Sequence, residues 1–161
     1  MTLGKRVAHG SQNCAARPNP KGNLSQTEQR IAMLIVEDQD FMRQMLREYL
    51  QSAYPDAAII EAADGARALE LCRSRSPQLV LMDVGLPDAN GIDLTAQVKE
   101  MLPDTAVIIV SQHAGRAYVE RARAAGAFAY ITKDKVYREL LPTVGRALDR
   151  APSGGGHGDP Q

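Results

Sequence analysis

The residues of this chain that could do chemistry follow short apolar runs. Asp83 comes directly after the run 79–82, the acidic pair Glu37-Asp38 follows an earlier run, and Lys133 follows a late one. Carboxylates held close together repel each other, so their joint ionisation at neutral pH needs a cation among them. Mg²⁺ suits such a cluster because it binds one or two carboxylates and fills its other positions with water and phosphate oxygens. These groups could support phosphoryl transfer to a carboxylate.

The apolar runs belong to a regular alternation of strand-like and helix-like segments that begins near residue 31. This alternation predicts an α/β fold, doubly wound around a five-stranded parallel sheet with five helices. The strands are expected at about 31–37, 57–61, 78–83, 105–111 and 127–132, and the helices at about 40–52, 64–75, 91–101, 114–125 and 135–149. The second helix is expected to begin at Asp64, a good N-cap residue, and to end before Pro77.

The length of 161 residues and the zero net charge fit one domain with its own core. Residues 1–30 and 151–161 are polar and lack a hydrophobic period, so they are expected to be flexible ends around a domain at 31–150. The two cysteines, Cys14 and Cys72, lack the spacing of a zinc site, which favours a reduced, cytoplasmic protein. No stretch approaches the about 18 apolar residues that span a membrane.

Four motifs surround the candidate residues. The segment 81–91 reads Leu-Met-Asp-Val-Gly-Leu-Pro-Asp-Ala-Asn-Gly, and the run 125–134 reads Ala-Gly-Ala-Phe-Ala-Tyr-Ile-Thr-Lys-Asp. The other two motifs are Ile35-Val36-Glu37-Asp38 and Val110-Ser111. Together they resemble the receiver domains of response regulators in two-component systems, over about residues 31–150. The resemblance implies a flavodoxin-like strand order, 2-1-3-4-5, which brings the acids that end strands 1 and 3 into one pocket.

The resemblance also implies roles for the acidic residues. Asp83 would be the phosphoacceptor, taking a phosphoryl group from a phosphohistidine of a histidine kinase or a histidine phosphotransfer protein. Asp38 and Asp83 would bind Mg²⁺ directly, and the backbone carbonyl of Gly85 would be a third ligand. Glu37 would act mainly through water.

Three further residues have implied roles in catalysis and switching. Ser111 would donate its hydroxyl to one phosphoryl oxygen, and Lys133 would bring its ammonium group to another. Phosphorylation would draw Ser111 inward and let Tyr130 turn into the space that it leaves. The signal would then leave through the surface formed by the last two helices and the last strand, to a downstream protein or to a second copy of the chain. Side chains available there are Tyr118, Arg121, Arg123, Tyr137, Arg138 and Arg146.

The sequence departs from the usual receiver pattern at two positions. Asp134 follows Lys133 where many receivers carry proline, so no cis peptide is expected there. Gln112 stands where small residues are usual, which bears on the lifetime of the phosphate. The sequence around Lys133 is most similar to that of receivers that precede a helix-turn-helix DNA-binding domain. The residues after Arg150 are too few for such a domain, so no nucleic-acid partner is expected for this chain. No membrane partner is expected either, because the chain lacks a long apolar stretch.

These features favour a single-domain response regulator that is not an enzyme beyond its own phosphorylation and slow dephosphorylation. One alternative is the receiver fragment of a DNA-binding transcription regulator, and another is a phosphate sink that drains a kinase. A Mg²⁺-dependent phosphohydrolase with Asp83 as nucleophile is less favoured. Such an enzyme usually has a second acid two residues after the nucleophile, where this chain has Gly85.

Overall fold

The computed structural model describes residues 30–150 as a parallel sheet of five strands in the order β2-β1-β3-β4-β5. The strands are β1 (Ala32–Val36), β2 (Ala58–Ala62), β3 (Leu79–Met82), β4 (Ala106–Ser111) and β5 (Ala129–Thr132). The helices are α1 (Asp40–Ala53), α2 (Gly65–Arg75), α3 (Gly91–Met101), α4 (Arg116–Ala124) and α5 (Val136–Arg150), with a 3₁₀ turn, η1, at Lys133–Lys135. The predicted fold class and strand order are confirmed. The flexible ends expected at 1–30 and 151–161 lie outside the described residues, apart from Arg30.

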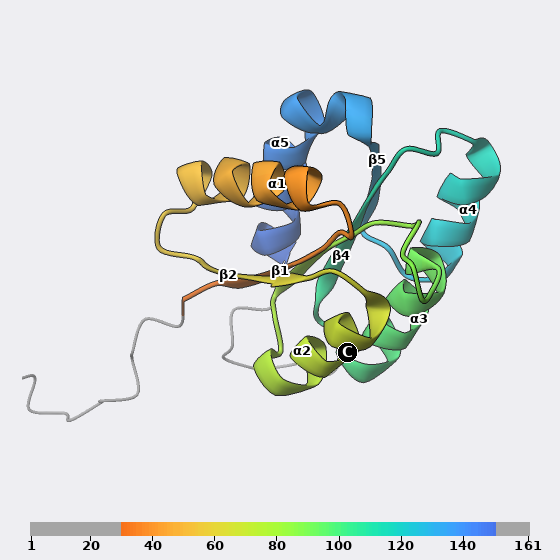
Figure 1. Ribbon diagram of the computed structural model, residues 1–161, viewed down its shortest axis with the longest axis horizontal. Helices are drawn as coiled ribbons and strands as arrows, with labels where there is room; N and C mark the ends of the chain where they lie inside the picture. The colour runs from red at the N-terminus through yellow and green to blue at the C-terminus, as the bar shows by residue number, and fades with distance from the viewer. Residues whose placement is uncertain (1–29, 151–161) are drawn as a thin grey trace, which may run out of the picture.

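Helices cover both faces of the sheet (Figure 1), and each face has its own core. Alternate residues of β1 point to opposite faces, as the two-residue period of a strand requires. Leu34 and Val36 pack with residues of α2, α3 and α4, whereas Met33 and Ile35 pack with residues of α1 and α5. The strands β1, β3 and β4 therefore read as nearly continuous apolar runs, which is typical of parallel strands buried on both faces.

The helix ends follow local side-chain chemistry. The Asp64 carboxylate accepts the N–H of Arg67 at 2.7 Å, so the predicted N-cap of α2 is correct. Asn90 caps α3 in the same way through the N–H of Ile92. Within residues 30–150 no helix has the length and apolar character needed to cross a membrane.

Several predicted element ends were one to two residues too long. Strand β1 ends at Val36 and β3 at Met82, so Glu37, Asp38 and Asp83 stand in the loops just beyond the strands. Thr132 ends β5, and Lys133 begins the 3₁₀ turn η1. Helix α4 begins at Arg116, not at 114, because residues 112–115 form an extended loop. The candidate acids and Lys133 therefore lie in loops, and the preceding strands fix where each loop begins.

The β3–α3 connection brings two backbones into close contact. A Cβ atom at Gly91 would lie 1.9 Å from the carbonyl oxygen of Asp83 and 2.9 Å from the Cα atom of Val84. A Cβ atom at Gly85 would meet nothing within 4 Å. The chain therefore needs glycine at position 91 for packing, whereas position 85 has room for a side chain.

We predict that Gly91→Ala lowers the free energy of unfolding by about 3 kcal/mol or more, because the clash is with backbone that cannot turn aside. Gly85→Ala is the control and should change it by less than about 0.5 kcal/mol. Urea unfolding followed by circular dichroism measures both. Equal stability of the two variants would contradict this account of the loop.

Candidate functional site

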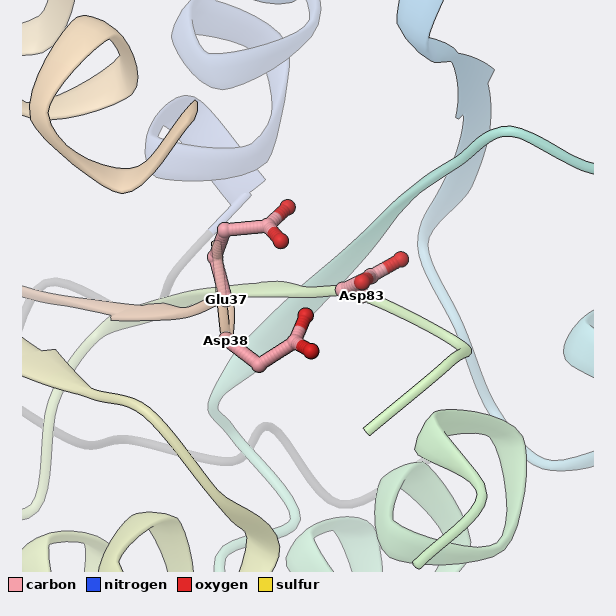
Figure 2. Close-up of side chains that lie close together, drawn as sticks. All are labelled: Glu37, Asp38 and Asp83. Carbon is pink, nitrogen blue, oxygen red and sulfur yellow. The ribbon is translucent and has the colours of Figure 1, made fainter. Parts of the chain in front are cut away.

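Three carboxylates meet at the carboxyl edge of the sheet. Glu37 and Asp38 come from the β1–α1 loop and Asp83 directly follows β3, and Figure 2 shows the three side chains close together. An oxygen of each lies within 4.8 Å of the others. The pairing of Val36 with Met82 sets this arrangement, and the N–H of Asp83 donates to the carbonyl of Val36 at 3.0 Å. The close approach of the acids follows from β1 and β3 being neighbours.

Lys133 supplies the positive charge of the cluster. Its Nζ atom lies 2.8 Å from Glu37 Oε2 and 3.5 Å from Asp83 Oδ2. Glu37 is 1% exposed and Asp83 7% exposed, and the Lys133 side chain is 13% exposed. The ammonium group therefore pairs with two carboxylates in a mostly buried environment, where Coulomb interactions are stronger than at an exposed surface.

Burial raises the pKa of Glu37 above its usual value of 4.5. The Lys133 ammonium opposes this rise, and the negative charge of Asp83 adds to it. The backbone N–H of Gln39 donates to Glu37 Oε1 at 3.1 Å and also favours the ionised form. The protonation of Glu37 thus depends on Lys133 remaining close.

A small cavity of about 160 Å³ opens beside the acids. It is lined by Asp38, Gln39, Asp83, Gly85, Ser111, Gln112, His113 and Lys133. The structure thus brings five of the seven predicted site residues to one space. Glu37 is buried beside Lys133 and is not among the lining residues. Tyr130, in the outer strand β5, does not line the cavity either. Gln39 and His113 were not predicted, because their types have no specific meaning at those positions until the loops are folded.

The β4–α4 loop is held by a short chain of contacts. The N–H of His113 donates to the Ser111 hydroxyl oxygen at 3.1 Å, and the Tyr130 hydroxyl donates to the carbonyl of His113 at 2.6 Å. The imidazole of His113 stacks on the ring of Tyr118 in α4, with centroids 4.6 Å apart. Tyr130 is half-buried, and this burial is the main reason that its pKa is raised. Ser111, which is buried, is thereby connected to β5 and α4.

The donor set fits Mg²⁺. Asp38 and Asp83 offer carboxylate oxygens, and Gly85, whose backbone carbonyl is a further oxygen donor, lines the same cavity. Mg²⁺ prefers such oxygen ligands and keeps several waters, which an open cavity allows. The crowding of carboxylates within 4.8 Å is also a physical reason for a divalent cation, since one ammonium cannot neutralise three acids.

Comparisons with known proteins agree with this geometry. The sequence model of the family described as response regulator receiver domain matches residues 33–144. The transcriptional regulatory protein PdtaR of Mycobacterium tuberculosis is 36% identical over 120 residues, which cover 73% of this chain and 57% of PdtaR. The chemotaxis protein CheY of Halobacterium salinarum is 36% identical over 101 residues, which cover 63% of this chain and 82% of that protein. The chain therefore spans little more than half the length of the regulator and most of the length of the chemotaxis protein.

A solved structure agrees as well. The CheY-like receiver domain protein from Methanospirillum hungatei superposes with a TM-score of 0.72 at 26% identity. The match covers 78% of this chain and 99% of that one. The likeness thus extends over nearly the whole of a receiver domain.

We predict that Lys133→Met destabilises the metal-free protein by about 2 kcal/mol or more near pH 7.5, because it leaves buried Glu37 without its counter-charge. The loss should be smaller near pH 5. The pKa of Glu37 is raised above its unfolded value, so the folded state takes up a proton as the pH falls, and a neutral carboxyl needs no partner.

Urea unfolding in a chelator at both pH values measures this difference. Lys135→Met is the control, since Lys135 lies in the same 3₁₀ turn and is exposed, and it should have little effect at either pH. A loss for Lys133→Met that does not change with pH would contradict the role assigned to Glu37.

Proposed function

This chain belongs to the response regulator receiver family of two-component signalling, and from that membership we propose that Asp83 is its phosphoacceptor. The donor would be a phosphohistidine of a histidine kinase or of a histidine phosphotransfer protein. The observation that carries the proposal is the convergence of Asp83, Asp38, Gly85, Ser111 and Lys133 on one cavity. We place this relay in the cytoplasm.

In the proposed reaction an oxygen of Asp83 attacks the phosphorus of the donor. The new bond is an acyl phosphate, and the bond from phosphorus to the imidazole nitrogen of the donor breaks, which returns that histidine to its neutral form once it takes up a proton. Asp38, Asp83 and the Gly85 carbonyl would hold Mg²⁺, with Glu37 acting through water. Bound there, the ion would neutralise charge on the phosphoryl oxygens.

Lys133 and Ser111 would complete the neutralisation. The ammonium group lies 3.5 Å from Asp83 Oδ2, so a phosphoryl oxygen attached to Asp83 falls within reach of a small movement. The Ser111 hydroxyl oxygen accepts from the N–H of His113, which leaves its own hydrogen free to donate to a phosphoryl oxygen. The two groups approach from β4 and from the end of β5, on the side of Asp83 away from β1.

The signal would leave through the contacts of His113. When the Ser111 hydroxyl moves toward the phosphoryl group, its hydrogen bond with the N–H of His113 would move His113 as well. The carbonyl of His113 accepts from Tyr130, and its ring stacks on Tyr118, so both tyrosines would respond. The surface formed by α4, β5 and α5 would change, and a downstream protein or a second copy of the chain would bind the changed surface. A phosphate-dependent difference of about 1.4 kcal/mol is enough to change partner occupancy about tenfold.

A second candidate follows from the relatives. The first of them are transcriptional regulators, and this chain covers about half of their length. The chain could therefore be the receiver part of a DNA-binding regulator, with the phosphoryl chemistry unchanged. Whether the natural reading frame continues past Gln161 separates the two. A phosphate sink is the third candidate, and a binding partner that depends on phosphorylation would argue against it.

We predict that acetyl phosphate places one phosphoryl group on Asp83, and that a chelator strongly reduces this labelling, because crowded acids repel an incoming phosphate when no divalent ion is bound. Asp83→Asn should abolish it. Asp93→Asn, which removes an exposed acid of α3, is the control and should leave it unchanged. Intact-mass spectrometry measures the labelling, and equal labelling of Asp83→Asn would refute the proposal.

We also predict how beryllofluoride, a phosphoryl mimic, changes the amide spectrum in the presence of Mg²⁺. Shifts should appear around Asp83, at His113 and Tyr130, and along α4. In Ser111→Ala the shifts near Asp83 should remain, and those at Tyr130 and α4 should be lost, since the hydroxyl that links them is gone. Shifts confined to the Asp83 pocket in the parent would favour the phosphate sink.

A further inference from the structure

An acidic residue outside the cavity ties the Asp83 loop to helix α2. Asp88 lies in the β3–α3 loop, between Gly85 and Asn90, and its carboxylate accepts the N–H of Gly65 at 2.8 Å and the N–H of Ala66 at 3.0 Å. Both donors belong to the first turn of α2, whose N–H groups have no partner within the helix. These contacts favour the ionised carboxylate and lower the pKa of Asp88. The ionised Asp88 side chain therefore joins two segments that are distant in sequence. We call its two hydrogen bonds to Gly65 and Ala66 the clamp.

Helix α2 does not depend on Asp88 alone for its cap. Asp64 accepts the N–H of Arg67 at 2.7 Å, so two carboxylates share the first turn of the helix. Asp64 comes from the β2–α2 loop and contributes to the helix by local contact. Asp88 comes from the loop that carries Gly85. Both Asp64 and Asp88 therefore stabilise α2, whereas of these two acids Asp88 is the one that connects α2 to the loop of the candidate metal site.

The loop that Asp88 fixes has a defined shape. Gly85 forms an antiparallel bridge with Asn90, and the N–H of Gly91 donates to the carbonyl of Val84 at 2.9 Å. Val84 and Leu86 are buried in the core, whereas Gly85 is exposed. Asp88 therefore sits at the far end of a narrow loop whose base is anchored. Its two hydrogen bonds hold that far end against α2.

The contact between the loop and α2 is direct. A Cβ atom at Gly65 would lie 2.8 Å from Leu94 Cδ1, 3.1 Å from Ala89 Cβ and 3.2 Å from Asp88 Oδ1. Glycine at position 65 thus lets the first turn of α2 approach the loop closely enough for Asp88 to bind two successive N–H groups.

We propose that Asp88 is a positioning residue for the Mg²⁺ site: by fixing the loop to α2 it holds the Gly85 carbonyl toward Asp38 and Asp83. This inference rests on the proposed function, because it takes the Gly85 carbonyl as a metal ligand. Groups that orient metal ligands commonly change metal affinity by 10-fold or more when they are removed. Asp88 acts through several residues of loop, so a smaller effect, about 3-fold to 10-fold, is expected.

The clamp also predicts a response of α2 to the ion. Coupling between two sites is reciprocal, so a loop that α2 helps to position for Mg²⁺ must in turn be held more firmly against α2 when Mg²⁺ binds. The amide signals of Gly65 and Ala66, which donate to Asp88, should shift on Mg²⁺ addition although neither residue lines the cavity.

The test compares three variants of the full chain, Asp88→Ala, Asp88→Asn and Asp64→Ala, by calorimetric titration with Mg²⁺ alone. Asp88→Ala should bind Mg²⁺ about 3-fold to 10-fold more weakly than the parent, and Asp88→Asn, which loses the charge and one acceptor oxygen, should lie between them. Asp64→Ala is the matched control. It removes a cap from the same helix and should lower thermal stability about as much, yet leave Mg²⁺ affinity within about 2-fold of the parent.

The outcomes separate this inference from the proposed function. A parent that does not bind Mg²⁺ overturns both. A parent that binds while Asp88→Ala and Asp88→Asn bind equally well overturns the positioning role and leaves the metal site standing. If Asp64→Ala weakens Mg²⁺ as much as Asp88→Ala does, the effect comes from α2 stability and the clamp is refuted. Should Asp88→Ala fail to fold, Asp88→Asn and the Gly65 and Ala66 shifts of the parent decide the question.

Discussion

The repulsion among three carboxylates at one sheet edge is the constraint on which the rest of the site depends. Glu37 and Asp83 are nearly fully buried, whereas Asp38 beside them is exposed, so water reduces only part of the repulsion. The long side chain of Lys133, starting just past β5, brings an ammonium group to two of the acids. A buried ion pair of this kind contributes little net stability over apolar packing, because desolvation offsets the attraction. Its presence in an otherwise apolar sheet is therefore better explained by chemistry than by folding.

Both the sheet and the loops determine where the site side chains lie. Strand pairing fixes the starting points, since Val36 lies beside Met82 and Ser111 beside Thr132. The loops then decide where the functional atoms lie, and in the β3–α3 loop this is achieved by close backbone contact. Gly91 lets the start of α3 pass against Asp83, and Gly65 lets α2 reach the same loop. Metal ligands need placement to a fraction of an ångström, which loops provide when their ends are clamped in this way.

The sequence predicted the strands well because apolar runs are short-range patterns, and Glu37, Asp38, Asp83 and Lys133 each directly follow such a run. The expectation that the acids share one pocket came from the strand order implied by the resemblance to receiver domains. The contact of Asp88 with Gly65 could not be foreseen, since the two residues are far apart in sequence and neither type is unusual in a loop. Tyr130 itself was expected as a switch residue, but its contact with the carbonyl of His113 could not be foreseen, because a backbone carbonyl carries no side-chain signature. Strand and helix ends shifted by one or two residues because loop packing, not periodicity, sets them.

The contrast between rigid strands and contact-dependent loops also explains how phosphorylation of Asp83 could alter a distant surface. Strands β1, β3 and β4, at and beside Asp83, are buried on both faces and close-packed, so they deform little when the charge of Asp83 changes. The exposed loop 112–115 differs, since three contacts of His113 join it to Ser111, Tyr130 and Tyr118. Each is an interaction of about 1 kcal/mol. A phosphoryl group that competes for the Ser111 hydroxyl would therefore need little free energy to rearrange this loop. Under the proposed function, loop 112–115 is thus the segment where a charge change at Asp83 would alter the surface of the protein.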